Sequence, residues 1–365
     1  MKKTKLILVG GFLGAGKTTL LWEAAQTLSR KGLRVGLITN DQAPGLVDTA
    51  FLSRGTVNVA EVNGSCFCCN FQGLMDAMSR VSADHQADIL IAEPVGSCTD
   101  LSATIIQPLK KLLGQEITVC PLSVMADPAR LKDILDGGTS GLHPSAAYIY
   151  RKQVEEADII VISKVDLMSQ AEIDVLKDRF EKLFSGKPVL AISAKTGEGM
   201  DKWLDVVTTT SAAGQYLADV DYDIYAEGEA VLGWLNATIL LEGKPTKWRG
   251  FAEQFLKTLG EKCELRSAPV GHIKLIIEAE DSFVMGNITG KQSALSIQGA
   301  EMTTARARLT INVRVQMPPD TLNDIINETL ASVVSDQLTM NIGAWRCLSP
   351  GRPNPTHRYN HIITA

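Results

Sequence analysis

Residues 11–18 read GFLGAGKT and match the pattern G-x-x-x-x-G-K-T. The apolar run 6–9 precedes this stretch and predicts a buried strand, and residues 19–28 predict a helix. A strand, a glycine loop and a helix in this order form a phosphate-binding loop, because glycines let successive backbone N–H groups face the phosphates. The positive end of the helix dipole lies at the same place. We therefore predict a nucleotide-binding protein; a chance glycine turn before a helix is the alternative.

This loop supplies most of the predicted phosphate contacts. Lys17 would neutralise the β- and γ-phosphates, and the Thr18 hydroxyl would bind Mg²⁺, so we assign both to the catalytic machinery. The residues that we expect to contact the nucleotide here are Gly11, Gly14, Ala15, Gly16, Lys17, Thr18 and Thr19.

Composition and length limit the classes of protein to which this chain can belong. The chain has 365 residues, of which 45% are hydrophobic and 21% charged, and its formal net charge is −5. This length favours two domains. The acidic balance offers no basic surface for nucleic acid, and no apolar run is long enough to span a membrane. We expect neither nucleic acid nor a membrane as a partner.

Cysteine usage indicates the compartment. The seven cysteines are an odd number, and three lie within residues 66–69, which favours metal or redox chemistry over a disulfide framework. The amino terminus imitates a signal peptide, but its apolar run breaks at Gly10 and Gly11 and leads into Lys17. We expect a cytoplasmic protein.

Apolar runs alternate with helical patterns as far as about residue 209. The expected strands are 6–9, 34–39, 57–62, 87–92, 118–125, 159–162 and 188–193. Buried strands that alternate with helices indicate an α/β fold with a mostly parallel, doubly wound sheet. Such sheets bind ligands beyond the carboxyl ends of their strands, where every motif described below lies.

The pattern changes near residue 228 to amphipathic strands, which are typical of an antiparallel sheet. The expected strands are 232–241, 272–278, 282–287, 293–298 and 307–315, with helices at 248–259 and 321–334. We predict a P-loop NTPase domain over 1–212, a linker over 213–227, a smaller α+β domain over 228–335 and a Pro/Gly-rich tail over 336–365 that wraps the surface.

Residues 163–166 read SKVD and resemble the N-K-x-D sequence of GTPases, with serine in place of asparagine. Asp166 would accept hydrogen bonds from the N1–H and amine of guanine; adenine lacks this donor pair and would leave the carboxylate unpaired. Lys164 would lie along the base, and an ordinary strand-end turn is the alternative. The residues that we expect around guanine are Ser163, Lys164, Asp166, Ser193, Ala194 and Lys195.

Two further segments are candidate switches. In the first candidate switch, residues 40–48, Asn40, Asp41 and Asp48 are expected to contact the γ-phosphate and Mg²⁺, with Asp41 as a Mg²⁺ ligand. In the second candidate switch, residues 93–98, Glu93 would hold a water on Mg²⁺ and the Gly96 N–H would meet the γ-phosphate. No glutamine or arginine is evidently placed to assist hydrolysis in cis, so we expect slow basal turnover.

Cys66, Cys68 and Cys69 lie close enough to converge on a soft or borderline ion such as Zn²⁺ or Co²⁺. Residues 68 and 69 point apart in an extended chain, so only two thiols would bind at once unless the loop turns. A redox pair and three inert buried thiols are the alternatives. Cys98 lies in the second candidate switch; it would tie metal binding to the γ-phosphate if it reached the cluster, or else be a small buried hydrophobe.

The tail carries further polar residues. His357 and His361 have i, i+4 spacing but follow a proline-rich coil, so we do not count them among the metal ligands. The arginines at 346, 352 and 358 leave open a contact with a partner or with the other domain.

These motifs together resemble the CobW-type metallochaperone GTPases, a branch of the P-loop class shared with the urease- and hydrogenase-maturation GTPases. The resemblance spans roughly residues 4–205 and rests on residues 10–19, 40–41, 66–69, 93–96 and 163–166. It implies a GTPase that uses GTP, GDP and Mg²⁺ and that binds Zn²⁺ or Co²⁺ at the Cys-x-Cys-Cys loop in its GTP state. Hydrolysis would release the metal to a client metalloprotein or corrinoid protein.

Three features depart from the family pattern. Ser65 separates Gly64 from the first cysteine, Cys98 replaces a small or acidic residue, and the second domain lacks a histidine-rich tract. A GTP-gated chaperone or adaptor for a corrinoid or methyltransferase client, with structural cysteines, is one alternative. An ATP-dependent kinase or ligase is another, and a homodimer is left open.

Overall fold

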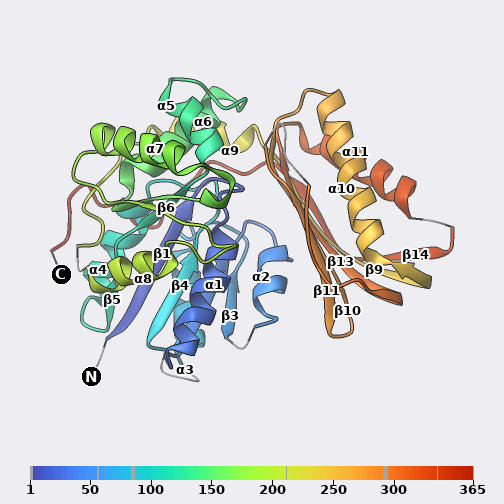
Figure 1. Ribbon diagram of the computed structural model, residues 1–365, viewed down its shortest axis with the longest axis horizontal. Helices are drawn as coiled ribbons and strands as arrows, with labels where there is room; N and C mark the ends of the chain where they lie inside the picture. Colours follow the sequence, from blue (N-terminus) through green and yellow to red (C-terminus); the bar gives the residue numbers. More distant parts are fainter. Residues whose placement is uncertain are drawn as a thin grey trace.

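The computed structural model describes residues 3–55, 57–83, 87–210, 212–290, 295–334 and 336–364, which form two separate β-sheets (Figure 1). The first sheet has the strand order β3-β2-β4-β1-β6-β7-β8, and β5 pairs with β1. Its strand pairs are parallel, which confirms the predicted α/β fold. Its strands are β1 (Thr4–Gly11), β2 (Val35–Asn40), β3 (Asn58–Val62), β4 (Ile89–Glu93), β5 (Ile117–Val119), β6 (Ser123–Ala126), β7 (Ile159–Ile162) and β8 (Val189–Ala191).

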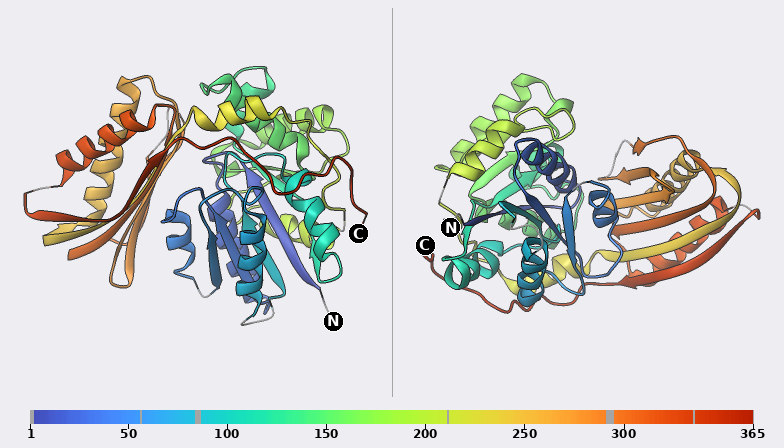
Figure 2. Two further views of the ribbon diagram at one scale, coloured as in Figure 1. Left: turned by 180° about the vertical axis from the view of Figure 1, so that it is seen from behind. Right: turned by 90° about the horizontal axis from the view of Figure 1, so that it is seen from below.

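Helices cover both faces of the first sheet (Figures 1 and 2). Successive side chains of a strand point to opposite faces, so Ile7 and Val9 pack with α1 and α8, whereas Leu6 and Leu8 pack with α3 and α4. The sheet is therefore doubly wound, as predicted. The helical elements are α1 (Lys17–Arg30), α2 (Val47–Leu52), α3 (Phe71–Ala83), η1 (Ser102–Ile106), α4 (Gln107–Leu113), α5 (Pro128–Leu135), α6 (Pro144–Glu156), η2 (Val165–Leu167), α7 (Gln170–Leu183) and α8 (Met200–Thr209).

The second sheet is antiparallel and has the order β12-β11-β10-β13-β9-β14. Helices α10 and α11 close its core on one face, and the other face lies against the first sheet's helix α2 (Figure 1). This arrangement confirms a smaller α+β part after the parallel sheet. Its elements are β9 (Gly233–Lys247), α10 (Trp248–Leu265), β10 (Val270–Ala279), β11 (Ser282–Ile288), β12 (Ser296–Gly299), β13 (Thr303–Val315), α11 (Pro319–Val333) and β14 (Leu338–Leu348).

The structure corrects three local expectations. Residues 118–125 were expected to form one strand but form β5 and β6, because Pro121 between them has no N–H to donate to a ladder. The expected linker contains the start of helix α9 (Tyr222–Ala230), which the Asp221 side chain caps through the N–H groups of residues 223 and 224. The tail begins with β14, whose backbone pairs with β9 before the proline-rich residues are reached.

The predicted domain boundaries themselves stay predictions. Residue 211 lies near the expected end of the first domain, residues 293 and 294 lie in an expected strand and residue 335 ends the expected second domain; all four are outside the described residues. Within the described ranges, no helix combines the length and apolar character needed to cross a membrane.

Candidate functional site: a nucleotide cavity between the two sheets

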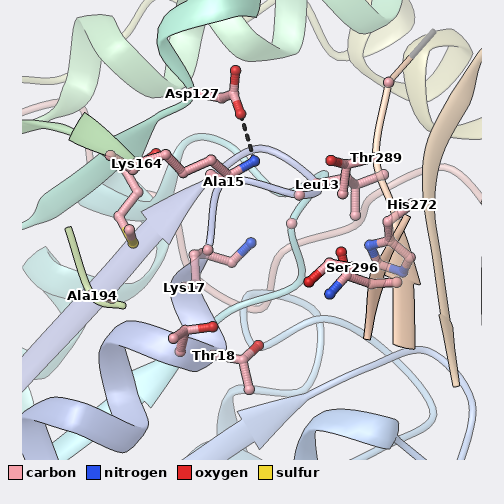
Figure 3. Close-up of a pocket in the computed structure, with 18 of the residues that line it drawn as sticks. Leu13, Ala15, Lys17, Thr18, Asp127, Lys164, Ala194, His272, Thr289 and Ser296 are labelled. Carbon is pink, nitrogen blue, oxygen red and sulfur yellow. Dashed lines mark hydrogen bonds and ion pairs between the residues drawn. The ribbon is translucent and has the colours of Figure 1, made fainter. Parts of the chain in front are cut away.

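The phosphate-binding loop faces a cavity of about 1460 Å³ that both sheets line (Figure 3). The first sheet contributes its carboxyl ends, and the second contributes His272 and Lys274 of β10, Met285 of β11 and Arg314 of β13. One cavity thus gathers nearly all the residues predicted to bind nucleotide, although Gly11 is not among its lining residues. The predicted residues that line it are Gly14, Ala15, Gly16, Lys17, Thr18, Thr19, Asn40, Asp41, Asp48, Glu93, Gly96, Ser163, Lys164, Asp166, Ser193, Ala194 and Lys195.

The phosphate-binding loop depends on glycine at two turns. Gly14 and Gly16 have φ values of 82° and 95°, a left-handed region that other residues rarely adopt, and Gly16 caps the start of α1. A Cβ atom at Gly14 would also lie 2.7 Å from the side chain of Thr289, in the segment after β11. Glycine therefore does two things here: it permits the left-handed turns of the loop, and at position 14 it leaves room for the Thr289 side chain.

A set of oxygen ligands surrounds the start of α1. The Thr18 hydroxyl donates to Glu93 Oε2 at 3.1 Å, and Lys17 Nζ lies 3.7 Å from Glu93 Oε1. Burial lowers the pKa of Lys17 and raises that of Glu93, while the attraction between the two opposes both effects. Hydroxyl and carboxylate oxygens are the ligands that Mg²⁺ prefers, so this donor set fits a magnesium ion.

Gly96 lies directly beside the phosphate-binding loop. A Cβ atom at this position would lie 3.0 Å from Lys17 Nζ and 2.8 Å from Leu13 Cδ2. Only a residue without a side chain therefore lets the backbone of the second candidate switch come this near to Lys17.

The first candidate switch is held by other contacts. Asn40 accepts from Phe67 N at 2.8 Å and donates to the carbonyl oxygens of Val62 and Ser65, so its amide shapes the cysteine loop. Asp41 forms an ion pair of 2.7 Å with Arg314. Both residues line the cavity, but the side-chain atoms that were expected to face Mg²⁺ and phosphate are bound elsewhere in this structure.

The predicted guanine residues lie together at the ends of β7 and β8. Asp166 Oδ1 accepts from the Ser193 hydroxyl at 2.7 Å, and the Ser163 hydroxyl donates to the carbonyl of Ala126 at 3.2 Å. The serine that replaces asparagine thus still links β7 to the end of β6. Lys164 adopts a left-handed φ of 56° and pairs with Asp127 at 2.7 Å.

Asp127, Arg130, His272, Lys274 and Arg314 are cavity residues that the sequence reasoning missed. Lys274 Nζ lies 2.7 and 2.9 Å from the two carboxylate oxygens of Asp48, and Arg130 Nη2 donates to the carbonyl oxygens of residues 270 and 271. A usable signal was present, because the polar residues 272 and 274 alternate with apolar residues in this strand.

The cysteine loop brings its thiols together. Cys66 and Cys68 Sγ lie 3.0 Å apart, Cys68 and Cys69 Sγ lie 3.8 Å apart, and the three sulfurs lie within 4.8 Å of one another. The loop turns, since the N–H groups of Cys69 and Asn70 both bind the carbonyl of Cys66. Because the loop turns, the expectation that only two of the three thiols could bind a metal at once no longer applies.

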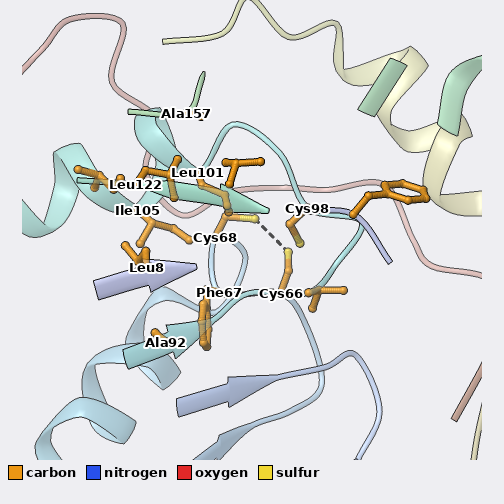
Figure 4. Close-up of a cluster of buried hydrophobic side chains, with 14 of the residues drawn as sticks. Leu8, Cys66, Phe67, Cys68, Ala92, Cys98, Leu101, Ile105, Leu122 and Ala157 are labelled. Carbon is orange, nitrogen blue, oxygen red and sulfur yellow. Dashed lines mark hydrogen bonds between the residues drawn. The ribbon is translucent and has the colours of Figure 1, made fainter. Parts of the chain in front are cut away.

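Cys98 joins this cluster from the second candidate switch. Figure 4 shows the Cys98 side chain beside Cys66 and Cys68, and the Cys66 thiol, together with burial, raises the pKa of Cys98 well above its usual value. Hydrogen bonds from the neighbouring thiols hold the pKa of Cys66 well below its usual value. Three thiols therefore converge with Cys98 beside them, and Cys66 is the one that most readily becomes a thiolate, the form that binds metals.

Residues 349–364, here called the carboxy-terminal strap, run back across the first sheet's helices (Figure 2). The N–H of Asn354 donates to Cys69 Sγ at 3.2 Å, and that of Thr356 donates to the Cys68 carbonyl at 2.8 Å. Arg358 pairs with the buried Asp100 at 2.7 Å, and the His357 ring packs on Phe71. Arg352 pairs with Asp223, so the strap arginines at 352 and 358 both bind within the chain.

Comparison with known proteins agrees with these features. The family described as CobW/HypB/UreG, nucleotide-binding domain, matches residues 5–191, which is more than half of the chain. The zinc chaperone CobW of Sinorhizobium sp is 27% identical over 222 residues, covering 54% of this chain and 60% of that protein. The zinc chaperone YjiA of Escherichia coli is 25% identical over 203 residues, covering 53% and 58% respectively.

The match to a third relative extends over most of that relative's length. The urease accessory protein UreG of Metallosphaera sedula is 27% identical over 201 residues, covering 53% of this chain and 89% of that protein. The chain spans less than two thirds of the length of the two zinc chaperones. The family match, the phosphate-binding loop and the cysteine cluster coincide in one parallel-sheet domain, and the chain belongs to the CobW/HypB/UreG family.

Proposed function

We propose that this protein is a GTPase that binds a transition metal ion at Cys66, Cys68, Cys69 and Cys98 in its GTP state and delivers it to a client metalloprotein on hydrolysis. One observation carries the proposal. The second candidate switch, residues 93–98, holds Glu93 against Thr18 at one end and brings Cys98 beside Cys66 and Cys68 at the other. A short segment therefore spans from the nucleotide cavity to the thiols.

The nucleotide half of the reaction uses the cavity residues. Backbone N–H groups of the phosphate-binding loop and Lys17 hold the phosphates, and Asp166 accepts from guanine. Thr18 and Glu93 would hold Mg²⁺, which when bound neutralises charge on the phosphates. In hydrolysis, water adds to the γ-phosphorus and the bond to the oxygen bridging to the β-phosphate breaks, which yields GDP and inorganic phosphate.

The metal half uses the thiols. Sulfur donors favour Zn²⁺ and Co²⁺ among divalent ions, and binding releases thiol protons because thiolates are the ligands. We favour Zn²⁺, since two of the relatives are named zinc chaperones. Co²⁺ is the second choice.

Loss of the γ-phosphate would free Gly96, and the connected Cys98 would shift away from the cluster. Removing one of four ligands weakens the site, which couples hydrolysis to release. The seven free cysteines favour a reducing cytoplasm as the place where this occurs.

The client is proposed only by class. UreG is named a urease accessory protein, which supports a metalloenzyme as recipient here too. A corrinoid protein stays a prediction from the sequence resemblance. No observation favours the adaptor with structural cysteines.

The test is a Co²⁺ titration of the reduced protein with Mg²⁺, once with a non-hydrolysable GTP analogue and once with GDP. We expect a thiolate-to-Co²⁺ absorption band that appears at lower metal concentration in the analogue state and is lost in Cys66→Ser and Cys98→Ser. Cys347→Ser, a thiol bonded to the Pro319 carbonyl in the second part of the chain, is the matched control. Equal weak binding in both nucleotide states would contradict the proposal and leave a GTP-gated adaptor.

A further inference from the structure

The second sheet presents cations to the first candidate switch. Lys274 of β10 pairs with Asp48 at 2.7 Å, and Arg314 of β13 pairs with Asp41 at 2.7 Å. All four side chains line the nucleotide cavity. Two strands of one domain therefore bind two carboxylates of the other where the terminal phosphate of a nucleotide is expected.

Of these cations, Lys274 lies next to the phosphate-binding loop. Its Nζ atom is 3.5 Å from the Thr18 hydroxyl, which itself donates to Glu93. Thr18 directly follows Lys17, so an ammonium group from a distant part of the chain stands beside the residues that are expected to hold Mg²⁺ and the β- and γ-phosphates.

Arg314 is bound differently. Its guanidinium donates to the carbonyl oxygens of Leu235 and Val313 as well as to Asp41, and it stacks 4.1 Å from the ring of Trp234. These contacts fix Arg314 in place as part of the sheet. Lys274 in contrast bonds to side chains: its three donors face the two Asp48 oxygens and, at 3.5 Å, the Thr18 hydroxyl, so a further acceptor can replace the long Thr18 contact while Asp48 is kept.

Charge balance indicates what that acceptor is. Within this cavity Lys274 is paired with one carboxylate, that of Asp48. A nucleoside triphosphate brings several negative charges, and the phosphate-binding loop supplies one lysine, Lys17, to meet them. A second ammonium near Thr18 meets the end of the nucleotide farthest from the base, which is the γ-phosphate.

We propose that Lys274 binds the γ-phosphate of GTP from the second sheet, with Asp48 holding it in position, so that the second sheet completes the GTPase site. This inference rests on the proposed function, because it assumes that GTP occupies the cavity. It places a second ammonium group, supplied by the second sheet, beside the Thr18 hydroxyl that follows Lys17. It also means that the second sheet distinguishes GTP from GDP, since GDP lacks the group that Lys274 binds.

The test compares Lys274→Gln, Lys274→Arg and the double variant Asp48→Asn/Lys274→Gln. Lys262→Gln is the matched control, because Lys262 pairs with an acidic side chain on the outer helices of the same domain. The measurements are affinities for a non-hydrolysable GTP analogue and for GDP, both with Mg²⁺, and single-turnover GTP hydrolysis.

We expect Lys274→Gln to weaken binding of the GTP analogue by about 10- to 100-fold, the size of a charged hydrogen bond, and to leave GDP binding unchanged. Hydrolysis should slow as well, while Lys274→Arg retains most of both properties. The double variant removes the half-buried pair without leaving an unpaired carboxylate, so it should fold; it should nevertheless discriminate GTP from GDP as poorly as Lys274→Gln.

Equal losses for GTP and GDP, or recovery of GTP preference in the double variant, would show that Lys274 only ties the two sheets together and would overturn the inference. If the wild-type protein binds the GTP analogue and Lys274→Gln binds it equally well, the inference is overturned and the proposed function stands. A wild-type protein that binds no guanine nucleotide would overturn both.

Discussion

The guanidinium of Arg314 lies 2.7 Å from the carboxylate of Asp41, and both side chains are buried between the two sheets. Asp41 comes directly after β2, and Arg314 belongs to β13 of the second sheet. The carboxyl end of a parallel strand is a usual ligand-binding position. Here a side chain of the other domain binds directly to that end. Any movement of the first candidate switch must therefore also move or release the second sheet.

This buried pair should be costly to break from one side. Arg314→Met leaves the Asp41 carboxylate without its cation, and we expect a loss of about 3–5 kcal/mol in the free energy of unfolding. Denaturant unfolding measures it. Asp41→Asn combined with Arg314→Met should recover much of the loss, and a single variant as stable as the wild type would disprove a structural role for the pair.

Asp166 should set the choice of base. Asp166→Ala removes the acceptor for the guanine N1–H and amine, and we expect GTP affinity to fall by about 10- to 100-fold while ATP affinity stays weak. Competition binding with both nucleotides measures this. Asp174→Ala, on the exposed surface of α7, is the control. Unchanged base preference in Asp166→Ala would favour the ATP-dependent alternative.

Asn40 should affect the affinity for metal rather than the affinity for nucleotide. Its amide makes three hydrogen bonds to the backbone around the cysteine loop, so Asn40→Ala should lower Co²⁺ affinity by about tenfold or more, as for other groups that position metal ligands. GDP affinity should not change. Asn63→Ala, at an exposed site before the loop, is the comparison. Weaker GDP binding with normal Co²⁺ binding would instead support the contact with nucleotide that the sequence suggested.

The carboxy-terminal strap should slow metal exchange. It bonds to Cys69 Sγ and to the Cys68 carbonyl, and Arg358 anchors it on Asp100. Arg358→Ala, or truncation after residue 348, should speed transfer of bound Co²⁺ to a chelator in stopped-flow absorption. Arg352→Ala removes an exposed ion pair of the same strap and should leave the rate unchanged. A transfer rate unaffected by truncation would show that the strap does not cover the exit path.

Stability should fall as the pH rises, in part through Glu156. Burial raises the pKa of this carboxyl to about 8, although it accepts hydrogen bonds from Thr99 and Ser102. The folded state therefore keeps a proton that the unfolded chain loses near its usual pKa of 4.5, so this contribution is complete below that pH and is lost as the pH rises toward 8. Glu156→Gln should flatten the decline in unfolding free energy between these two values. A decline as steep as in the wild type would exclude Glu156 as its source.

Local sequence was sufficient for the parts of the site made by neighbouring residues. The phosphate-binding loop, with Lys17 and Thr18, follows from one strand, one glycine turn and one helix, since each restricts the conformation of the next. The order of buried strands likewise predicted the parallel sheet, and the carboxyl-end rule placed Glu93 and Asp166 at one edge. The three cysteines of one loop were visible for the same reason.

Tertiary structure alone decided which distant groups meet these residues. Lys274 and Arg314 alternate with apolar neighbours in their strands, which indicates two different faces but does not name the surface that either face meets. Asn40 was expected at the phosphates, yet its amide binds the cysteine loop, because β2 and β3 are neighbours in the sheet. The sequence by itself determined the phosphate-binding loop and the fold around it; the packing of one sheet against the other decided which cations face the cavity and what covers the thiols, because contacts between segments far apart in the chain leave no local pattern.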